Sequence, residues 1–263
     1  MKPATGLAAL APALLLAAAG ASAGEVTVAV AANAAEAAEA LAADFEQRTG
    51  HRVTVTVGST GKLYAQILHG APFDVFLAAD QERPRLLLER GLAVADSRRT
   101  YAIGRLVLWS SDPTLEASAE TLRGGSFRWL AIANPDLAPY GAAARATLRE
   151  LGLWESLRSK IVVGENVGQS FTMAASGNAE LGLVALSSVI DPRNGREGSC
   201  WEIPEHLHAP IRQDAVLLDR GGENPAAREF HLFLGSYRAR RTIESFGFAV
   251  VGHPGLEALS GER

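Results

Sequence analysis

Residues 25–80 read EVTVAVAANAAEAAEALAADFEQRTGHRVTVTVGSTGKLYAQILHGAPFDVFLAAD, and this segment predicts the fold class. Short runs rich in β-branched or apolar residues predict three buried strands, at residues 25–32, 53–57 and 74–78. Asn33 follows the first strand and is expected to cap a helix that Gly50 ends. That helix has an apolar face with helical spacing, formed by Ala34, Ala37, Ala38, Leu41 and Phe45.

The same alternation of strand and helix continues along the chain. Further helices are expected after the second strand and after Asp80, which suits a helix cap. A second unit predicts strands at residues 106–109, 129–133, 161–163 and 181–185, with helices at 142–151 and after Asn166. A late strand at 214–218 and helices at 226–234 and 240–246 finish the chain. Parallel strands need helical crossovers, so this order predicts an α/β protein with open, mostly parallel sheets flanked by helices.

The N-terminus has the pattern of an export signal. Lys2 is followed by an apolar run from Leu7 to Ala19 and by the small-residue sequence Ala21-Ser-Ala23. A membrane anchor is the alternative, but the run is shorter than the roughly 20 residues of a spanning helix. We therefore expect residues 1–23 to be a signal peptide that is cleaved after Ala23, which places the mature protein outside the cytoplasm.

Composition limits the classes of function. The remaining 240 residues, in a chain that is 48% hydrophobic, suit two packed lobes of roughly 100 to 150 residues each. The formal net charge is −4, and it becomes −5 when Lys2 is removed, so we expect neither a nucleic-acid nor an anionic-membrane partner. The single cysteine, Cys200, has no partner for an internal disulfide. An anionic ligand would have to be held by local dipoles.

Four passages from strand to helix are the candidate binding loops: Ala32-Asn33, Gly58-Ser59-Thr60-Gly61, the segment 134–141 that contains Tyr140, and the segment 166–170 that contains Val167. At each passage the unpaired N–H groups and the positive end of a helix dipole favour an anion. Any one of them is an ordinary helix start in an α/β protein. Together, at the carboxyl ends of strands in two lobes, they indicate a ligand cleft.

Other motifs are weaker. The second passage is not a phosphate-binding P-loop, because Thr56 stands where the first glycine is required and Leu63 where Ser or Thr would hold magnesium. Cys200, His206 and His208 lack a standard zinc spacing, and a surface loop is the preferred interpretation. The chain offers no set of acid, base and nucleophile, which disfavours a secreted hydrolase. The effector lobe of a DNA-binding regulator is disfavoured by the export signal and by the absence of a DNA-binding segment before the first strand.

Four segments carry a resemblance to a known family: VGSTGKLYAQ at 57–66, GAPFDVFLAAD at 70–80, YAIGRLVLW at 101–109 and IANPDLAPYG at 132–141. In this order they resemble the periplasmic molybdate-binding proteins of ABC importers, over nearly the whole mature chain. The resemblance implies a two-lobed type II periplasmic-binding fold. It also implies a discontinuous first lobe, residues 24–103 plus 214–263, and a second lobe, residues 104–213.

The resemblance also implies the function and the contacts. The expected role is a non-enzymatic, monomeric protein that needs no cofactor, binds molybdate or tungstate in the periplasm and delivers it to a membrane permease; sulfate or phosphate is the alternative ligand. The oxyanion contacts, without direct metal ligation, fall on Asn33, Thr60, Tyr140 and the backbone N–H of Val167, with Ala32 and Ser59 beside them. Some relatives have a tyrosine at the position of Ala185; its role is assigned here to Tyr140.

Overall fold

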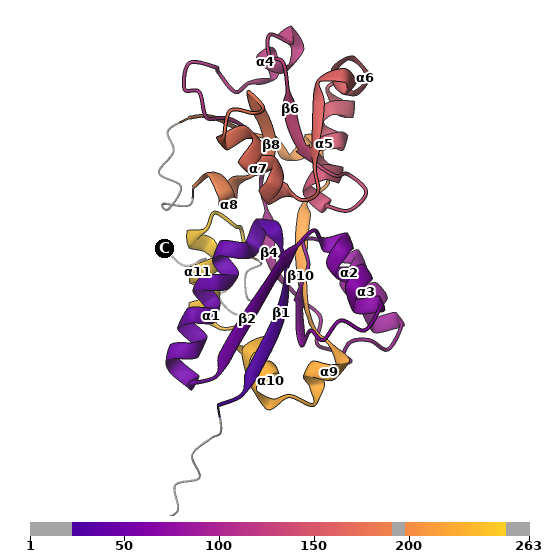
Figure 1. Cartoon of the computed structure of the whole chain (residues 1–263), viewed down its shortest axis with the longest axis vertical. Coiled ribbons are helices and arrows are strands. Elements are labelled where there is room, and N and C mark those ends of the chain that lie inside the picture. Colours follow the sequence, from indigo (N-terminus) through magenta and orange to yellow (C-terminus); the bar gives the residue numbers. More distant parts are fainter. Residues whose placement is uncertain (1–22, 191–197, 251–263) are drawn as a thin grey trace, which may run out of the picture.

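Two lobes are stacked along the long axis of the molecule in the computed structural model, which describes residues 23–190 and 198–250 (Figure 1). Each lobe is built on one five-stranded sheet. The first sheet has the order β2 (Arg52–Gly58), β1 (Glu25–Ala31), β3 (Val75–Leu77), β10 (Ile211–Leu217) and β4 (Arg99–Gly104). The second has the order β7 (Ile161–Gly164), β6 (Leu130–Ala133), β8 (Leu181–Ala185), β5 (Leu106–Ser110) and β9 (Ser199–Glu202).

Both sheets are mostly parallel. In the first, β1 pairs in parallel with β2 and β3, and β10 alone runs in the opposite direction, between β3 and β4. In the second, β6 pairs in parallel with β7 and β8, and β5 alone runs in the opposite direction, between β8 and β9. The predicted fold class is therefore confirmed, and each sheet has its reversed strand at a crossing between the lobes.

Helices cover both faces of the first sheet. The first lobe carries η1 (Ala32–Ala34), α1 (Ala35–Thr49), α2 (Thr60–Leu68), α3 (Glu82–Glu89), α9 (Asp219–Gly222), α10 (Pro225–Phe233) and α11 (Tyr237–Ser245). On one face, α1, α10 and α11 share a core in which the Phe45 and Phe230 rings meet edge to face at 5.2 Å. On the other face, α2 and α3 contribute Leu63, Ile67 and Leu87. The first and last parts of the chain thus build one lobe (Figure 1).

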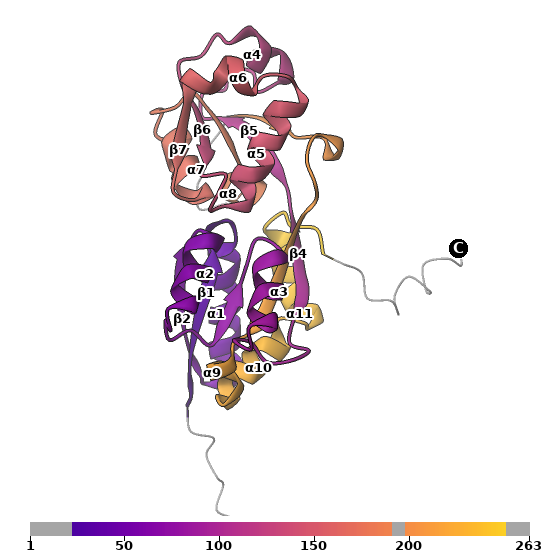
Figure 2. The same ribbon diagram turned by 90° about the vertical axis from the view of Figure 1, so that its right-hand side faces the viewer.

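The second lobe has its own core around β5, β6 and β8, which contains the buried Trp109. It carries α4 (Ala119–Gly124), α5 (Pro139–Glu150), α6 (Trp154–Leu157), η2 (Arg158–Lys160), α7 (Val167–Ala175), α8 (Leu186–Val189) and η4 (Glu205–Leu207). The chain crosses between the lobes from β4 to β5 and from β9 to β10 (Figure 2). The residue limits of the two lobes stay a prediction.

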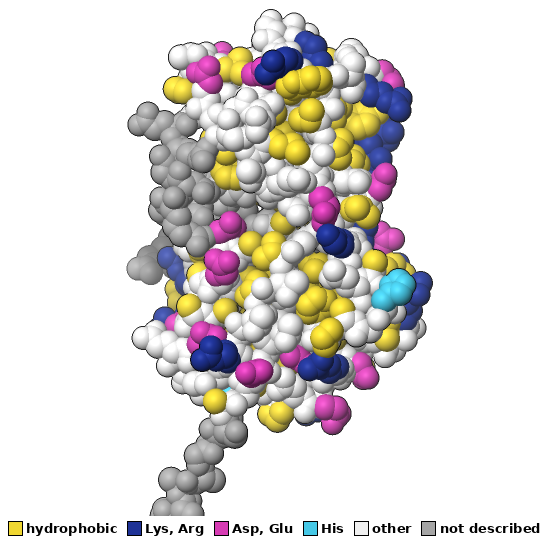
Figure 3. Space-filling model, viewed as in Figure 1, with side chains coloured by type: hydrophobic (Ala, Val, Ile, Leu, Met, Phe, Trp, Pro, Cys, Tyr) yellow, Lys and Arg dark blue, Asp and Glu magenta, His cyan; other side chains and the backbone are white. Residues whose placement is uncertain are grey.

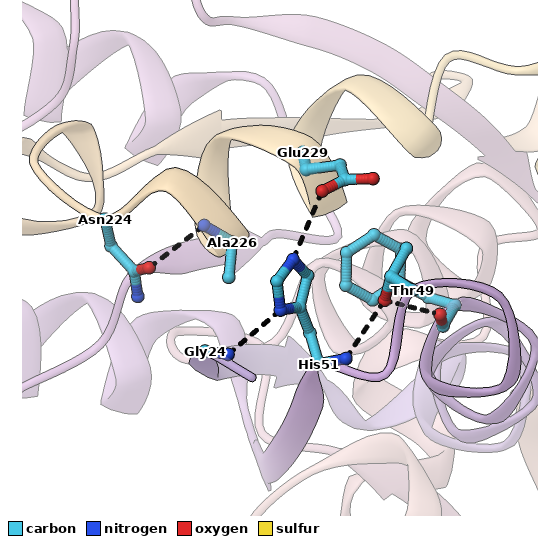
Figure 4. Close-up of polar contacts among 7 residues, drawn as sticks. Gly24, Thr49, His51, Asn224, Ala226 and Glu229 are labelled. Carbon is cyan, nitrogen blue, oxygen red and sulfur yellow. Dashed lines mark hydrogen bonds and ion pairs between the residues drawn. The ribbon is translucent and has the colours of Figure 1, made fainter. Parts of the chain in front are cut away.

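The start of the first strand is fastened to α10 (Figure 4). The Gly24 N–H donates to His51 Nδ1 at 2.9 Å, and His51 Nε2 lies 3.2 Å from Glu229. The Asn224 side chain donates to the Glu25 carbonyl at 2.7 Å and accepts from the Ala226 N–H at 3.1 Å. These contacts join the beginning of the described chain to a helix near its end.

Two local predictions are wrong. Asn33 does not cap the first helix: α1 begins at Ala35 after a 3₁₀ turn, and the Asn33 side chain is buried and donates elsewhere. Cys200 lies in the edge strand β9, because that segment pairs with β5, and not in a surface loop. His206 lies in η4 and His208 follows it.

Gly50 ends α1 in the left-handed conformation, as predicted, with φ of 74°. All but the last residue of the proposed signal peptide lies outside the described residues. Within the described part of the chain, no helix is long and apolar enough to cross a membrane.

Candidate functional site

A small cavity lies between the lobes, where the four predicted loops converge. About 10 Å³ of it is open to the centre of a water-sized sphere, which is roughly the space of one such sphere. All six predicted contact residues line it: Ala32, Asn33, Ser59, Thr60, Tyr140 and Val167. Ala31, Ala79, Ala138, Pro139 and Asn166 complete the lining. The space suits one small ion surrounded by protein.

A larger groove, with about 460 Å³ open to the centre of a water-sized sphere, runs along the edge of the interface between α3, α5 and residues 209–212. We do not assign the ligand to it. The half-buried carboxylate of Asp80 in this groove is already paired with Arg83, and α5 lines the groove largely with alanine methyl groups. Burial raises the pKa of Asp80, while the neighbouring Arg83 charge opposes that rise.

Three helix starts bring N–H groups to the small cavity. Ser59 caps α2, Asn166 caps α7 by accepting from the Gln169 N–H at 3.0 Å, and Pro139 is the first residue of α5. The first N–H groups of a helix have no partner within the helix and carry the positive end of its dipole. Val167, the first residue of α7, therefore presents a donor from the second lobe opposite those of the first.

Two hydroxyl groups on the first lobe each accept a hydrogen bond from a backbone N–H. Thr60 Oγ1 accepts from the Ala79 N–H at 3.1 Å, and Ser59 Oγ accepts from the Lys62 N–H at 3.4 Å. Both residues are buried. A hydroxyl that accepts in this way still has its proton to donate. The pair is therefore suited to a ligand that presents acceptor atoms.

A buried polar network, which the sequence analysis missed, lies behind the cavity. Asn33 Nδ2 and the Tyr101 hydroxyl both donate to Gln213 Oε1, at 2.8 and 3.0 Å. Gln213 Nε2 lies 3.4 Å from the Tyr140 oxygen, to which it donates. Burial raises the pKa of the Tyr140 phenol well above its usual value, so the hydroxyl stays protonated. The sequence held one signal, a Gln-Asp pair directly before the apolar end of a strand.

No carboxylate belongs to the cavity lining among residues 23–190 and 198–250. Asp136, the acidic residue of the Tyr140 loop, points to solvent with 79% of its side chain exposed and pairs with Arg145 at 3.1 Å. The described residues also contain no group of three or more His, Cys, Asp or Glu side chains that could hold a metal ion. The lining therefore consists of neutral donors and apolar groups.

The two lobes are in contact around the cavity. The Gly61 N–H donates to the Leu137 carbonyl at 2.8 Å, and the Ser187 hydroxyl donates to the Asn33 carbonyl at 2.7 Å. Lys62 and Glu165 form an ion pair across the interface at 2.8 Å. The structure is thus a closed clamp. On the face in Figure 3, basic and acidic side chains are interspersed, with no basic field.

The fold and the site define a protein that encloses a small solute between two lobes. A family model described as bacterial extracellular solute-binding protein matches residues 26–249, so the chain belongs to that family. The sequence is similar to the molybdate-binding protein ModA of Azotobacter vinelandii, with 47% identity over 88% of this chain and 92% of the relative. Identity to the ModA protein of Rhodobacter capsulatus is 46%, over 87% and 89%.

Solved structures agree with this assignment. The periplasmic molybdate-binding protein of Azotobacter vinelandii superimposes with a TM-score of 0.83 at 39% identity, over 86% of this chain and all of the other. The sulfate-binding protein SubI of Mycobacterium tuberculosis has a TM-score of 0.71 at 14% identity, over 89% of both chains. That second likeness concerns the fold alone. The predicted family and the class of solute-binding protein are confirmed.

Proposed function

We propose that this chain captures molybdate or tungstate in the small cavity and delivers it to the membrane permease of an ABC importer. The observation that carries the proposal is a small cavity between the lobes, lined by neutral donors from both, with no carboxylate among its described lining residues. Molybdate is a dianion near neutral pH, so it accepts hydrogen bonds at every oxygen. The similarity to two proteins named as molybdate-binding supports this ligand class.

Each donor has a role in the proposal. Asn33, Ser59 and Thr60 approach the ion from the first lobe, and Tyr140 and the Val167 N–H approach it from the second. Hydrogen bonds to a charged partner contribute about 1.5 to 3 kcal/mol each, more than neutral ones. Because donors of both lobes bind one ion, the ion stabilises the closed arrangement. The protein then presents a different surface to the permease with and without its ligand, and no chemical step is involved.

Titration calorimetry of residues 24–263 tests the proposal. Molybdate and tungstate should bind one ion per chain, with sulfate much weaker and phosphate weakest. Asn33→Asp changes the shape of the side chain little but sets a carboxylate against the anion, and it should abolish binding. Asn178→Asp is the matched control, because Asn178 is exposed and its side chain donates to Ser176 in a surface turn. A wild-type protein that binds neither molybdate nor tungstate would refute the proposal.

The location and the processing of the chain belong to the same proposal. A molybdate carrier for an importer works in the periplasm as a monomer, which fits the predicted signal peptide. N-terminal sequencing of protein exported by a bacterial host should begin at Gly24-Glu25-Val26. Exported protein that retains Met1 would contradict the predicted cleavage.

A further inference from the structure

Four buried polar side chains connect the two lobes behind the cavity. Gln213 lies on β10 of the first sheet and is fully buried, as is Asn33 at 1% exposure. Tyr101 lies on β4 of the same sheet, and Tyr140 lies at the start of α5 in the second lobe. The Gln213 amide is thus a direct polar link between the strand at the crossing and a helix of the other lobe.

We propose that Gln213 is a positioning residue that directs the Tyr140 hydroxyl proton toward the bound oxyanion when the lobes close. This inference rests on the proposed function and assigns to that site a residue that does not line the cavity. The direction of the Tyr140 hydroxyl proton is set by which atoms of the Gln213 side chain accept hydrogen bonds and which donate them.

The amide oxygen of Gln213 is fully used. It has two lone pairs, and they are taken by Asn33 Nδ2 at 2.8 Å and the Tyr101 hydroxyl at 3.0 Å. This arrangement leaves the NH₂ group facing Tyr140. Because an amide nitrogen only donates, the phenol oxygen must accept from it, at 3.4 Å. The single proton of Tyr140 is then free to donate to a ligand in the cavity that Tyr140 lines.

The backbone around the network is shaped to admit it. A β-bulge between Gln213 and Asp214 interrupts the pairing of β10 with β4, and bulges commonly redirect side chains beside functional sites. Gly104 ends β4 directly beside the contact. A Cβ atom there would lie 2.1 Å from the Tyr140 oxygen and 2.5 Å from Gln213 Nε2. Only glycine leaves room for the two side chains to meet.

A glutamate at the same position would reverse the direction of one hydrogen bond. Its first oxygen still accepts from Asn33 and Tyr101, whereas its second, when ionised, accepts the Tyr140 proton and turns the phenol lone pairs toward the anion. When protonated, the second oxygen donates to Tyr140 as the amide does. A buried carboxyl group titrates above its usual pKa, so both forms are accessible between about pH 5.5 and 8.5.

The test measures molybdate affinity by calorimetry at several pH values for the wild type, Gln213→Glu, Tyr140→Phe and the double variant. Gln213→Glu should approach wild-type affinity near pH 5.5 and lose about a hundredfold or more by pH 8.5, while the wild type stays flat. The loss at high pH should be about tenfold smaller in the Tyr140→Phe background, because the hydroxyl contribution is already absent there. Gln66→Glu, an exposed change of the same kind on α2, should show no such pH dependence.

If the affinity losses of Gln213→Glu and Tyr140→Phe are independent, so that they multiply in the double variant at every pH, the inference is overturned. A folded Gln213→Glu variant whose molybdate affinity does not recover at low pH would overturn it too. If Gln213→Glu does not fold, Gln213→Met in the wild-type and Tyr140→Phe backgrounds gives the same comparison without a charge. Independent affinity losses of Gln213→Met and Tyr140→Phe would also overturn the inference. A wild type that binds no oxyanion would refute the proposed function and this inference together. Wild-type binding with independent losses would refute the inference alone.

Discussion

The two adjacent hydroxyls of the second binding loop provide a sharp test of the site, and Thr60 should matter more than Ser59. Thr60→Val keeps the shape of the side chain and removes one O–H donor. Losing a hydrogen bond to a charged ligand costs about 1.5 to 3 kcal/mol, which is roughly a ten- to hundredfold loss of molybdate affinity. Ser59→Ala should cost less than about fivefold, because the family resemblance places the ligand-facing hydroxyl on Thr60, while Ser59 caps α2.

The same pair of variants also differs in stability without ligand. Thr60→Val leaves the buried Ala79 N–H without its acceptor, at a cost of about 1 to 3 kcal/mol. For a chain of this size, 1 kcal/mol lowers the melting temperature by roughly 2–4 °C, so a decrease of about 2–12 °C is expected. Ser59→Ala loses a helix cap, worth about 0.5 to 2 kcal/mol. Its destabilisation should therefore be similar to or smaller than that of Thr60→Val.

Calorimetry with molybdate and differential scanning calorimetry without it separate the two effects. The reasoning is refuted if Ser59→Ala weakens binding tenfold while Thr60→Val leaves it unchanged. That outcome would shift the ligand-facing hydroxyl by one residue. Equal and large losses of molybdate affinity in Ser59→Ala and Thr60→Val would mean that both hydroxyls contact the ion.

Three further predictions follow from the closed, carboxylate-free cavity. Gly104→Ala should displace the Tyr140 hydroxyl and lower both the melting temperature and molybdate affinity, with a packing cost of about 1 to 3 kcal/mol; unchanged affinity would show that Tyr140 is not a contact. Phosphate, which keeps a proton near neutral pH, should fail to displace molybdate in competition calorimetry, because the lining offers that proton no carboxylate; equal affinity would overturn the donor-only site. Small-angle scattering should show a smaller radius of gyration with molybdate than without, and an unchanged radius with proven binding would mean a site formed before the ligand arrives.

Local patterns were sufficient for most of the fold. Strand and helix alternate with clear periodicity, and the stop signals are local: Gly50 ends α1 with a left-handed φ of 74°, and Asn166 caps α7 as predicted. The four candidate loops also follow from local order, because the carboxyl ends of parallel strands share one edge of a sheet. That geometry brings residues far apart in sequence to one cavity.

The features that the sequence did not predict depend on residues that are far apart along the chain. Asn33 has the residue type of a helix cap, but its amide donates to Gln213, 180 positions further along the chain. Gln213 stands in no recognisable motif, and Tyr101 opens one of the segments that carry the resemblance but is given no role by it. Each acquires its role only when β10 is placed beside β4. Cys200 belongs to a Pro-containing stretch, a pattern that favours a loop, whereas pairing with β5 makes its segment an edge strand.

The position of β10 has a consequence for the order in which the molecule folds. β4 joins the first sheet only through β10, and β10 is made after all of β5 to β9. The second sheet uses one continuous stretch of chain, so it is able to form first, whereas β4 must wait for its strand partner β10, more than 100 residues away. Pulse-labelled hydrogen exchange during refolding should accordingly protect β5 and β8 before β4 and β10.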